Sequence, residues 1–415
     1  MNEPILSRRD LLGGIAALPW LSRLRRSRAD DPALILVWLD GGMSHLDTFD
    51  AKPSAPIEIR GDTKSIAGAI DGSFVNAWLP KLAARLDRAT LIRNLGHGEG
   101  NHDRGTHFHL TGARPTIQLE PPSLGALASR TAESPSDLPS YVAIPAAPIA
   151  GGAGCLPASC APFATGGDPS RTDFAVRNLA ARADPRTADL LAILDSADDG
   201  PRSEAERAHD HFVRRAQQLS SAPASREAFD LKLESPARRE RFGRHRLGQS
   251  CLLAARLVAH GVKVALVRDD GWDHHQRIAA ALETGFPPKL QQLDDGVAAL
   301  LDDLRDGPLA GRAIVCVASE FGRTPRLNAL GGRDHWPRAQ SVLLAGTGVG
   351  EGVLVGSTDA HGEEPLDEAL SPADLFATLV HLLRIDAEPL RAPDGRMVRV
   401  VGEGASPIAA ALARR

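Results

Sequence analysis

The sequence is poor in aromatic residues, in long apolar runs and in any excess of positive charge. Aromatic residues make up 4% of the 415 residues, which argues against a surface that stacks nucleobases or sugars. The net charge of −4 gives no electrostatic reason to expect a nucleic-acid partner. No apolar run reaches the roughly 18 residues that a membrane-spanning helix needs, so we expect no integral membrane segment.

Cysteine is also scarce, with four residues in the whole chain. Cys251 falls in a helical pattern and Cys316 in an apolar run, so both are typical of small core residues. Cys155 and Cys160 lie close together in GCLPASCAP and could form a local disulfide if the protein is exported. The spacing alone leaves that pairing open.

The first thirty residues differ from the rest of the chain. Arg8-Arg9 is followed by DLL and by a short, weakly apolar stretch, which resembles a twin-arginine export signal. A functional signal implies the twin-arginine export machinery as a partner and a periplasmic or cell-surface location. Otherwise residues 1–30 are a disordered basic tail and the protein is cytoplasmic.

Residues 31–415 are predicted to form a single α/β domain. Apolar residues make up 43% of the chain, enough for a sizeable core. Short apolar runs alternate with amphipathic stretches, and this alternation favours a mostly parallel sheet covered on both faces. Pro and Gly cluster within residues 113–235, where we expect an irregular insertion. The predicted strands are residues 33–39, 89–93, 262–267, 313–318 and 341–345, and the predicted helices are residues 78–88, 204–219, 237–260, 288–306 and 371–384.

Acidic and imidazole side chains follow or precede several of these strands. Ligands of open α/β sheets bind at the carboxyl ends of the strands, so a shared site is predicted there. Each residue also has an ordinary alternative, as a helix cap, a turn acid or a solvated histidine. The strand-end candidates are Asp40, Asp273, His274, His275, Glu320, Asp334 and His335, and residues 97–109 form a histidine-rich segment.

Several longer motifs occur in order: GGMSHLDTFDAKP, NHDRGTHFHLTGARP, GWDHH and SEFGRTPRLNALGGRDHWP. Together they resemble the bacterial family called domain of unknown function 1501, from about residue 33 to the C-terminus. That family is similar to the alkaline phosphatase and sulfatase superfamily. The resemblance implies a three-layer α/β/α sandwich with a mostly parallel central sheet and a metal site. It also implies hydrolysis or transfer of phosphate or sulfate esters.

The resemblance can be carried over residue by residue. It implies a metal-binding set of Asp40, Asp273, His275, Glu320 and His335, with His274, Asp334, Asp47 and His45 as additional candidates. Phe321 stands where sulfatases carry a histidine. The position of the sulfatase nucleophile falls on His102, which is itself a potential metal ligand.

The implied ligands mix oxygen and nitrogen, which suits a divalent Zn, Mn, Fe or Ca ion. A metal-bound hydroxide would then be the nucleophile, with Arg323 as a further catalytic residue. Arg326 and Arg333 could bind the tetrahedral group of a small anionic ester substrate. The first hypothesis is thus a metal-dependent hydrolase of phosphate or sulfate esters. The alternative is a non-catalytic exported protein that keeps the fold and a structural or vestigial metal site.

Overall fold

The computed structural model describes residues 31–116, 120–131, 138–176, 223–285, 288–392 and 395–414. The candidate export signal and the helix predicted over 204–219 lie outside these ranges, so both stay predictions. Within them, every helix is too short or too polar to cross a membrane.

An eight-stranded sheet forms the centre of the described chain, in the order β12-β4-β11-β8-β1-β7-β5-β6. All its strands run parallel except β11, which is antiparallel to both neighbours. The mostly parallel sheet is therefore confirmed. The strands are β1 (Ala33–Asp40), β4 (Ala89–Leu95), β5 (Tyr141–Ile144), β6 (Phe163–Ala164), β7 (Val264–Asp270), β8 (Ala313–Ala318), β11 (Gln340–Gly346) and β12 (Val353–Val355).

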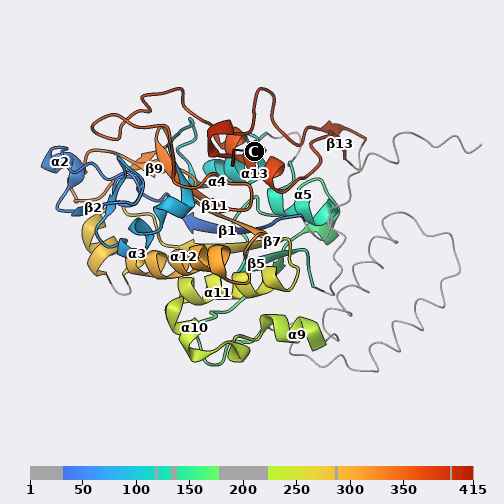
Figure 1. Cartoon of the computed structure of the whole chain (residues 1–415). Helices are drawn as coiled ribbons and strands as arrows, with labels where there is room; N and C mark the ends of the chain where they lie inside the picture. Colours follow the sequence, from blue (N-terminus) through green and yellow to red (C-terminus); the bar gives the residue numbers. More distant parts are fainter. Residues whose placement is uncertain are drawn as a thin grey trace, which may run out of the picture.

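Helices cover both faces of this sheet, which confirms the three-layer α/β/α sandwich (Figure 1). One face carries α3 (Pro80–Ala83), α11 (Arg246–Ala259) and α12 (Lys289–Asp306). The other face carries α4 (His102–Thr111), α5 (Leu124–Thr131) and α13 (Pro372–Leu382). Helix α13 confirms the helix predicted over residues 371–384, and it begins with Ser371 as N-cap in a capping box and Pro at the first helical position.

Strand β1 shows why both faces need a cover. Its alternate side chains enter two different cores, because successive residues of a strand point to opposite faces. Ile35 and Val37 pack in the core beneath α11 and α12. Leu34 and Leu36 pack in the core beneath α5 and α13. A strand buried on both sides has one continuous apolar run, and this pattern predicts β1 from the sequence.

The long helix predicted over residues 237–260 is wrong as a single element. It is divided into α10 (Pro236–Arg241) and α11, with a turn between them. Gly243 in this turn has a φ of 82°, a conformation that residues other than glycine rarely adopt. Residues 236–241 (PARRER) have no buried side chain, so no apolar pattern marks where α10 ends and α11 begins.

Residues 113–235 contribute more to the sheet than the sequence suggested. Strands β5 and β6 come from this segment and extend the sheet beyond β7. The expectation of an irregular insertion is therefore wrong for residues 141–144 and 163–164. Both strands are short and bounded by Pro and Gly, which made them look like loops.

The remaining described elements are small. Two-stranded ribbons are formed by β2 (Ser65–Ala67) with β3 (Phe74–Asn76), β9 (Gly322–Arg323) with β10 (His335–Trp336), and β13 (Leu390–Arg391) with β14 (Met397–Val398). Short helices are α2 (Ile57–Arg60) and α9 (Pro223–Phe229), with 3₁₀ turns at Leu86–Arg88, Ala158–Cys160, Leu231–Leu233 and Ala409–Ala411 and a π-helical turn at Ala280–Thr284.

Candidate metal centre

The sheet topology brings four distant segments to one edge. Strands β1, β7 and β8 end there, and the antiparallel β11 begins there. The ribbon of β9 and β10 holds Arg323 opposite His335 at this edge. Helix α4 starts at the same place, with His102 as its first residue and Asn101 as its N-cap.

Three side chains from these segments form a compact group. Potential ligand atoms of His102, Asp273 and His335 all lie within 4.8 Å of one another. His275 joins them, because its Nε2 lies 3.0 Å from Asp273 Oδ1 and 3.0 Å from His335 Nε2. We call His102, His275, His335 and Asp273 the His–Asp cluster.

The other ring nitrogen of each histidine in the His–Asp cluster contacts an oxygen. Nδ1 of His102 lies 2.6 Å from Glu320 Oε1. Nδ1 of His275 lies 2.7 Å from Asp334 Oδ1. Nδ1 of His335 lies 2.8 Å from the carbonyl oxygen of Gly100.

Asp273 is held in the His–Asp cluster by Arg323. The Arg323 side chain is fully buried and donates to Asp273 Oδ1 and to the carbonyl oxygens of Gly41 and Gly42. Burial by itself raises the pKa of Asp273, but the hydrogen bond and the charge of Arg323 outweigh it, so the pKa lies below its usual value. Asp273 is therefore a carboxylate near neutral pH. Its side chain is 45% exposed, so solvent reaches it.

Glu320 lies beneath the His–Asp cluster and is fully buried. Besides His102, its Oε1 accepts from the backbone N–H of Gly41 at 2.9 Å. Its Oε2 lies 3.0 Å from the hydroxyl of Ser319. The sequence predicted Glu320 as a metal ligand, and the structure shows its oxygens engaged by protein groups.

Phe321 supplies an apolar wall. Its ring is buried and lies 5.0 Å from the ring of His102 and 4.7 Å from that of His335, between centroids. Phe321 therefore packs against the imidazoles and offers no ligand atom. Gly42 is required beside it, because an added Cβ would lie 2.5 Å from the Phe321 ring.

The pKa values of two clustered histidines shift in opposite directions. The hydrogen bond that His102 donates to the Glu320 carboxylate raises the pKa of His102 above its usual value. Burial lowers the pKa of His335. Both rings lie against Phe321, so the difference comes from the acceptor at Nδ1, which is a buried carboxylate for His102 and a backbone carbonyl for His335.

Asp40 lies next to the cluster and not within it. Its Oδ2 accepts from Nε and Nη2 of Arg268, both at 2.6 Å. Burial and the nearby charge of Glu320 raise the pKa of Asp40 despite this ion pair. Its role as a ligand stays a prediction, and a metal there would have to compete with the guanidinium of Arg268.

Five further candidates lie away from the cluster's ligand atoms or serve other contacts. Arg333 is fully buried and is bound by Asp47 and by the carbonyl oxygens of Ile59, Thr324 and Pro325, so it cannot reach a substrate anion. The same ion pair occupies the carboxylate of Asp47, so that carboxylate is not directed at the His–Asp cluster.

His45 is fully buried, with Nε2 2.8 Å from the Gly362 carbonyl oxygen. Burial lowers the pKa of His274 to about 4. Arg326 is exposed.

The sequence analysis missed some contributors to the site. His97 lies within the histidine-rich segment but was not singled out, and its Nε2 is 2.8 Å from the carbonyl oxygen of Glu320. The Gly100 carbonyl that contacts His335 left no signal, because a backbone oxygen is present at every position. Only the fold determines which carbonyl faces a given ring.

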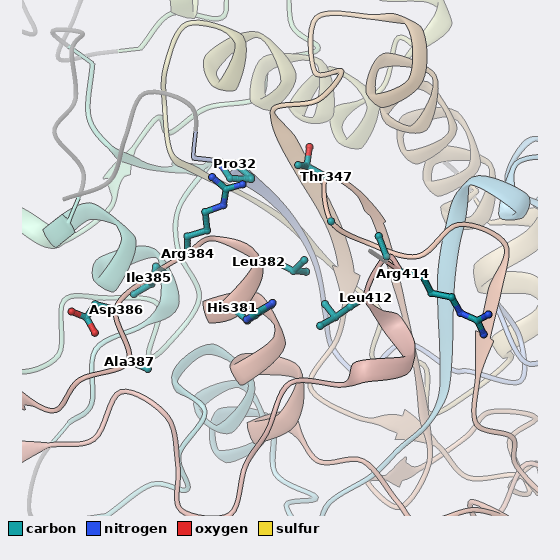
Figure 2. A pocket seen from close by; sticks show the side chains of 12 residues that line it. Pro32, Thr347, His381, Leu382, Arg384, Ile385, Asp386, Ala387, Leu412 and Arg414 are labelled. Carbon is teal, nitrogen blue, oxygen red and sulfur yellow. The ribbon is translucent and has the colours of Figure 1, made fainter. Parts of the chain in front are cut away.

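A separate depression of about 880 Å³ opens at the opposite edge of the sheet (Figure 2). Pro32, just before β1, and Thr347, just after the antiparallel β11, both line it. The end of α13 contributes His381 and Leu382, and the residues just after it contribute Arg384. None of the predicted site residues lines this depression, so it is distinct from the His–Asp cluster.

The comparison with known families identifies the chain. Residues 31–412 match the family described as protein of unknown function (DUF1501). The chain belongs to this family. The match covers every residue of the His–Asp cluster in this DUF1501 protein, and it confirms the resemblance seen in the motifs. A sequence comparison with curated proteins finds no match.

Solved structures similar to this DUF1501 protein include an alkaline phosphatase and a sulfatase. The protein Ps i-CgsB has a TM-score of 0.40 and 11% identity, over 86% of this chain and 73% of its own. Alkaline phosphatase from the Antarctic bacterium TAB5 has a TM-score of 0.37 and 13% identity, over 86% and 99%. The PsFucS1 sulfatase from Pseudoalteromonas sp. has a TM-score of 0.34 and 12% identity, over 92% and 72%. Similarity at this level carries no argument about activity or site residues.

The donor set of the His–Asp cluster fits a divalent metal ion. Carboxylate and carbonyl oxygens are hydrogen-bond acceptors, so a neutral ring whose Nδ1 faces one keeps its proton there when its Nε2 binds a metal. Each Nε2 in a neutral ring then presents a lone pair. Nε2 of His275 and Nε2 of His335, only 3.0 Å apart, would repel each other unless a cation or a proton lies between them.

Proposed function

We propose that this DUF1501 protein is a metal-dependent hydrolase of phosphate or sulfate esters. The observation that carries the proposal is the convergence of three imidazole rings on the carboxylate of Asp273, at the edge where α/β sheets bind ligands. Three nitrogens and one oxygen suit Zn, Mn or Fe better than Ca, which prefers oxygen ligands.

His102, His275, His335 and Asp273 would hold the metal. A divalent metal supplies Lewis acidity and lowers the pKa of bound water toward about 7. The protein's own residues do the positioning. Arg323 orients Asp273 from the buried side, while Phe321 keeps water away from the inner faces of two rings. The side chains of Asp273 and His275 are partly exposed, which leaves the outer side open to an ester.

A non-catalytic protein with a structural metal is the second candidate. The observation that favours it is the burial of Arg323 and Arg333, whose guanidinium groups bind protein oxygens. An ester dianion would therefore have to rely on the metal or on exposed residues such as Arg326 for charge compensation. The residues at the sulfatase nucleophile and histidine positions, His102 and Phe321, also depart from the superfamily pattern.

The decisive experiment measures metal content and ester hydrolysis on the same preparations. Purified protein, reconstituted with Zn, Mn or Fe, is assayed on aryl phosphates and aryl sulfates. We expect Asp273→Asn and His275→Ala to lower kcat/KM by more than about 100-fold, since a lost ligand costs more than a lost supporting contact. The control is Asp306→Asn, because that side chain is 83% exposed on α12.

One result would decide against hydrolysis, and another would decide against the His–Asp cluster as its site. If the wild-type protein holds a metal but cleaves no ester with any metal supplied, the non-catalytic candidate is correct. If the Asp273→Asn variant keeps full activity, the cluster is not the active site. Export by the twin-arginine machinery is a separate prediction, which tests of secretion with Arg8 and Arg9 replaced by Lys would address.

A further inference from the structure

We infer that Glu320 and Asp334 are positioning residues that hold His102 and His275 in the tautomer able to bind a metal, and that neither carboxylate is itself a ligand. The inference rests on the proposed metal centre but not on its activity. It reverses the role that the sequence suggested for Glu320.

The contacts of Glu320 support the positioning role. An ionised carboxylate offers about four lone-pair sites. Three are used, by the N–H of Gly41, by the hydroxyl of Ser319 and by Nδ1 of His102. Because the side chain is fully buried and bound on both oxygens, it is rigid. A rigid acceptor 2.6 Å from Nδ1 fixes both the proton and the ring plane of His102.

Asp334 repeats this arrangement from another segment. Its Oδ1 lies 2.7 Å from Nδ1 of His275 and 3.3 Å from the amide nitrogen of Asn328. Its backbone is anchored to Thr324, whose N–H donates to the Asp334 carbonyl and whose hydroxyl accepts from the Asp334 N–H. The side chain is 56% exposed, so solvent weakens the contact relative to that of Glu320.

His335, the third histidine of the His–Asp cluster, also has an acceptor at Nδ1, in this case a backbone carbonyl oxygen. Nδ1 of His335 faces the Gly100 carbonyl at 2.8 Å. All three histidines therefore keep the proton on Nδ1 and direct Nε2 toward Asp273. Three independent segments with one proton arrangement indicate a single nitrogen-rich metal position, and they place Glu320 and Asp334 one layer outside it.

The test uses the full chain and cobalt(II), whose visible absorption reports its coordination. Dissociation constants are measured for wild type, Glu320→Ala, Glu320→Gln, Asp334→Ala and Asp334→Asn. We expect about a 10- to 100-fold weaker affinity for Glu320→Ala and about 10-fold for the more exposed Asp334→Ala. The amide oxygen in Glu320→Gln and Asp334→Asn can still accept from Nδ1, so both should bind within a few-fold of wild type. All four should keep the wild-type spectrum, and the control is Asp306→Ala.

Other outcomes overturn the inference. A changed cobalt spectrum in Glu320→Gln would show that Glu320 is a ligand. Unchanged affinity in both alanine variants would show that neither carboxylate positions a ring. Glu320→Ala also leaves the Gly41 N–H without its acceptor. If that variant does not fold, the Asp334→Ala and Asp334→Asn variants, at an exposed side chain, still test whether a carboxylate positions its ring. A wild-type protein that binds cobalt but cleaves no ester would contradict only the proposed function.

Discussion

Two histidines of helix α4, His102 and His109, show how the setting decides the role of a residue type. His102, at the first position of the helix, is partly exposed and faces Glu320 and Asp273. His109 is buried, with Nδ1 3.0 Å from the Gly105 carbonyl oxygen and Nε2 3.0 Å from the side-chain nitrogen of Gln340. One ring is available for chemistry and the other is a polar part of the core.

Burial of His109 makes the stability of the fold depend on pH. Burial lowers its pKa to about 3, whereas in the unfolded chain the pKa is about 6.5. Between these values the unfolded state binds the extra proton, so the free energy of unfolding falls on acidification, by up to about 1.4 kcal/mol per pH unit. This contribution is complete above about pH 6.5 and is lost toward pH 3.

Replacing His109 by a side chain that does not titrate removes the proton that the unfolded state binds. We expect His109→Gln to show a shallower loss of unfolding free energy between pH 6.5 and 3 than wild type, measured by urea denaturation at each pH. His361→Gln is the control, because His361 is exposed and its replacement should leave the slope unchanged. Equal slopes in wild type and His109→Gln would contradict the assignment.

At the scale of elements, the turn between α10 and α11 determines how α11 begins. Gly243 precedes His245, whose side chain caps α11 by accepting from the N–H of Gly248 at 3.1 Å. A Cβ on Gly243 would lie 2.2 Å from His245 Nε2. The positive φ and the cap therefore both depend on glycine.

Gly243→Ala should lower the free energy of unfolding more than a Gly→Ala change at a position where the added Cβ meets no neighbouring atom. The left-handed backbone alone costs about 1–2 kcal/mol for a residue with a Cβ, and displacing the helix cap adds about 1 kcal/mol. Gly311→Ala is the matched control, because Gly311 has a φ of 69° and no heavy atom lies within 4 Å of an added Cβ. Denaturant titration of the two variants compares them. Equal losses would show that the cap contributes nothing.

At the scale of the whole molecule, the candidate metal centre exists only when the domain is assembled. Its residues come from the start of α4, from the loop after β7 and from β10, at sequence positions between 102 and 335. An unfolded chain cannot hold them together, so metal binding should favour the folded state.

Metal should therefore stabilise the entire fold. At a free metal concentration 100 times the dissociation constant, we expect the free energy of unfolding to rise by about 2.7 kcal/mol, and excess chelator should reverse the rise. His335→Ala should lose this response while unfolding in a single transition. A rise of the same size in His335→Ala would mean that the ion binds elsewhere.

Much of the fold could be predicted from local patterns. Strands β1, β7 and β8 each contain a continuous apolar run because both faces of the sheet are covered. Ser371 and Pro372 mark the start of α13. The patterns failed where an element is short, as in β5 and β6, or where one glycine changes the chain direction, as at Gly243. Tertiary contacts outweigh local preference at such positions.

The sequence itself determined the residue types of the site and the sheet edge where they gather. Strand ends and acidic or imidazole side chains can be recognised along the chain. Only the tertiary structure decided which atoms face one another. Strand order and the antiparallel β11 place Glu320 behind His102, Asp40 against Arg268 and the Gly100 carbonyl against His335. Hydrogen bonds act over about 3 Å, so a residue's role depends on neighbours that are hundreds of positions away in the chain.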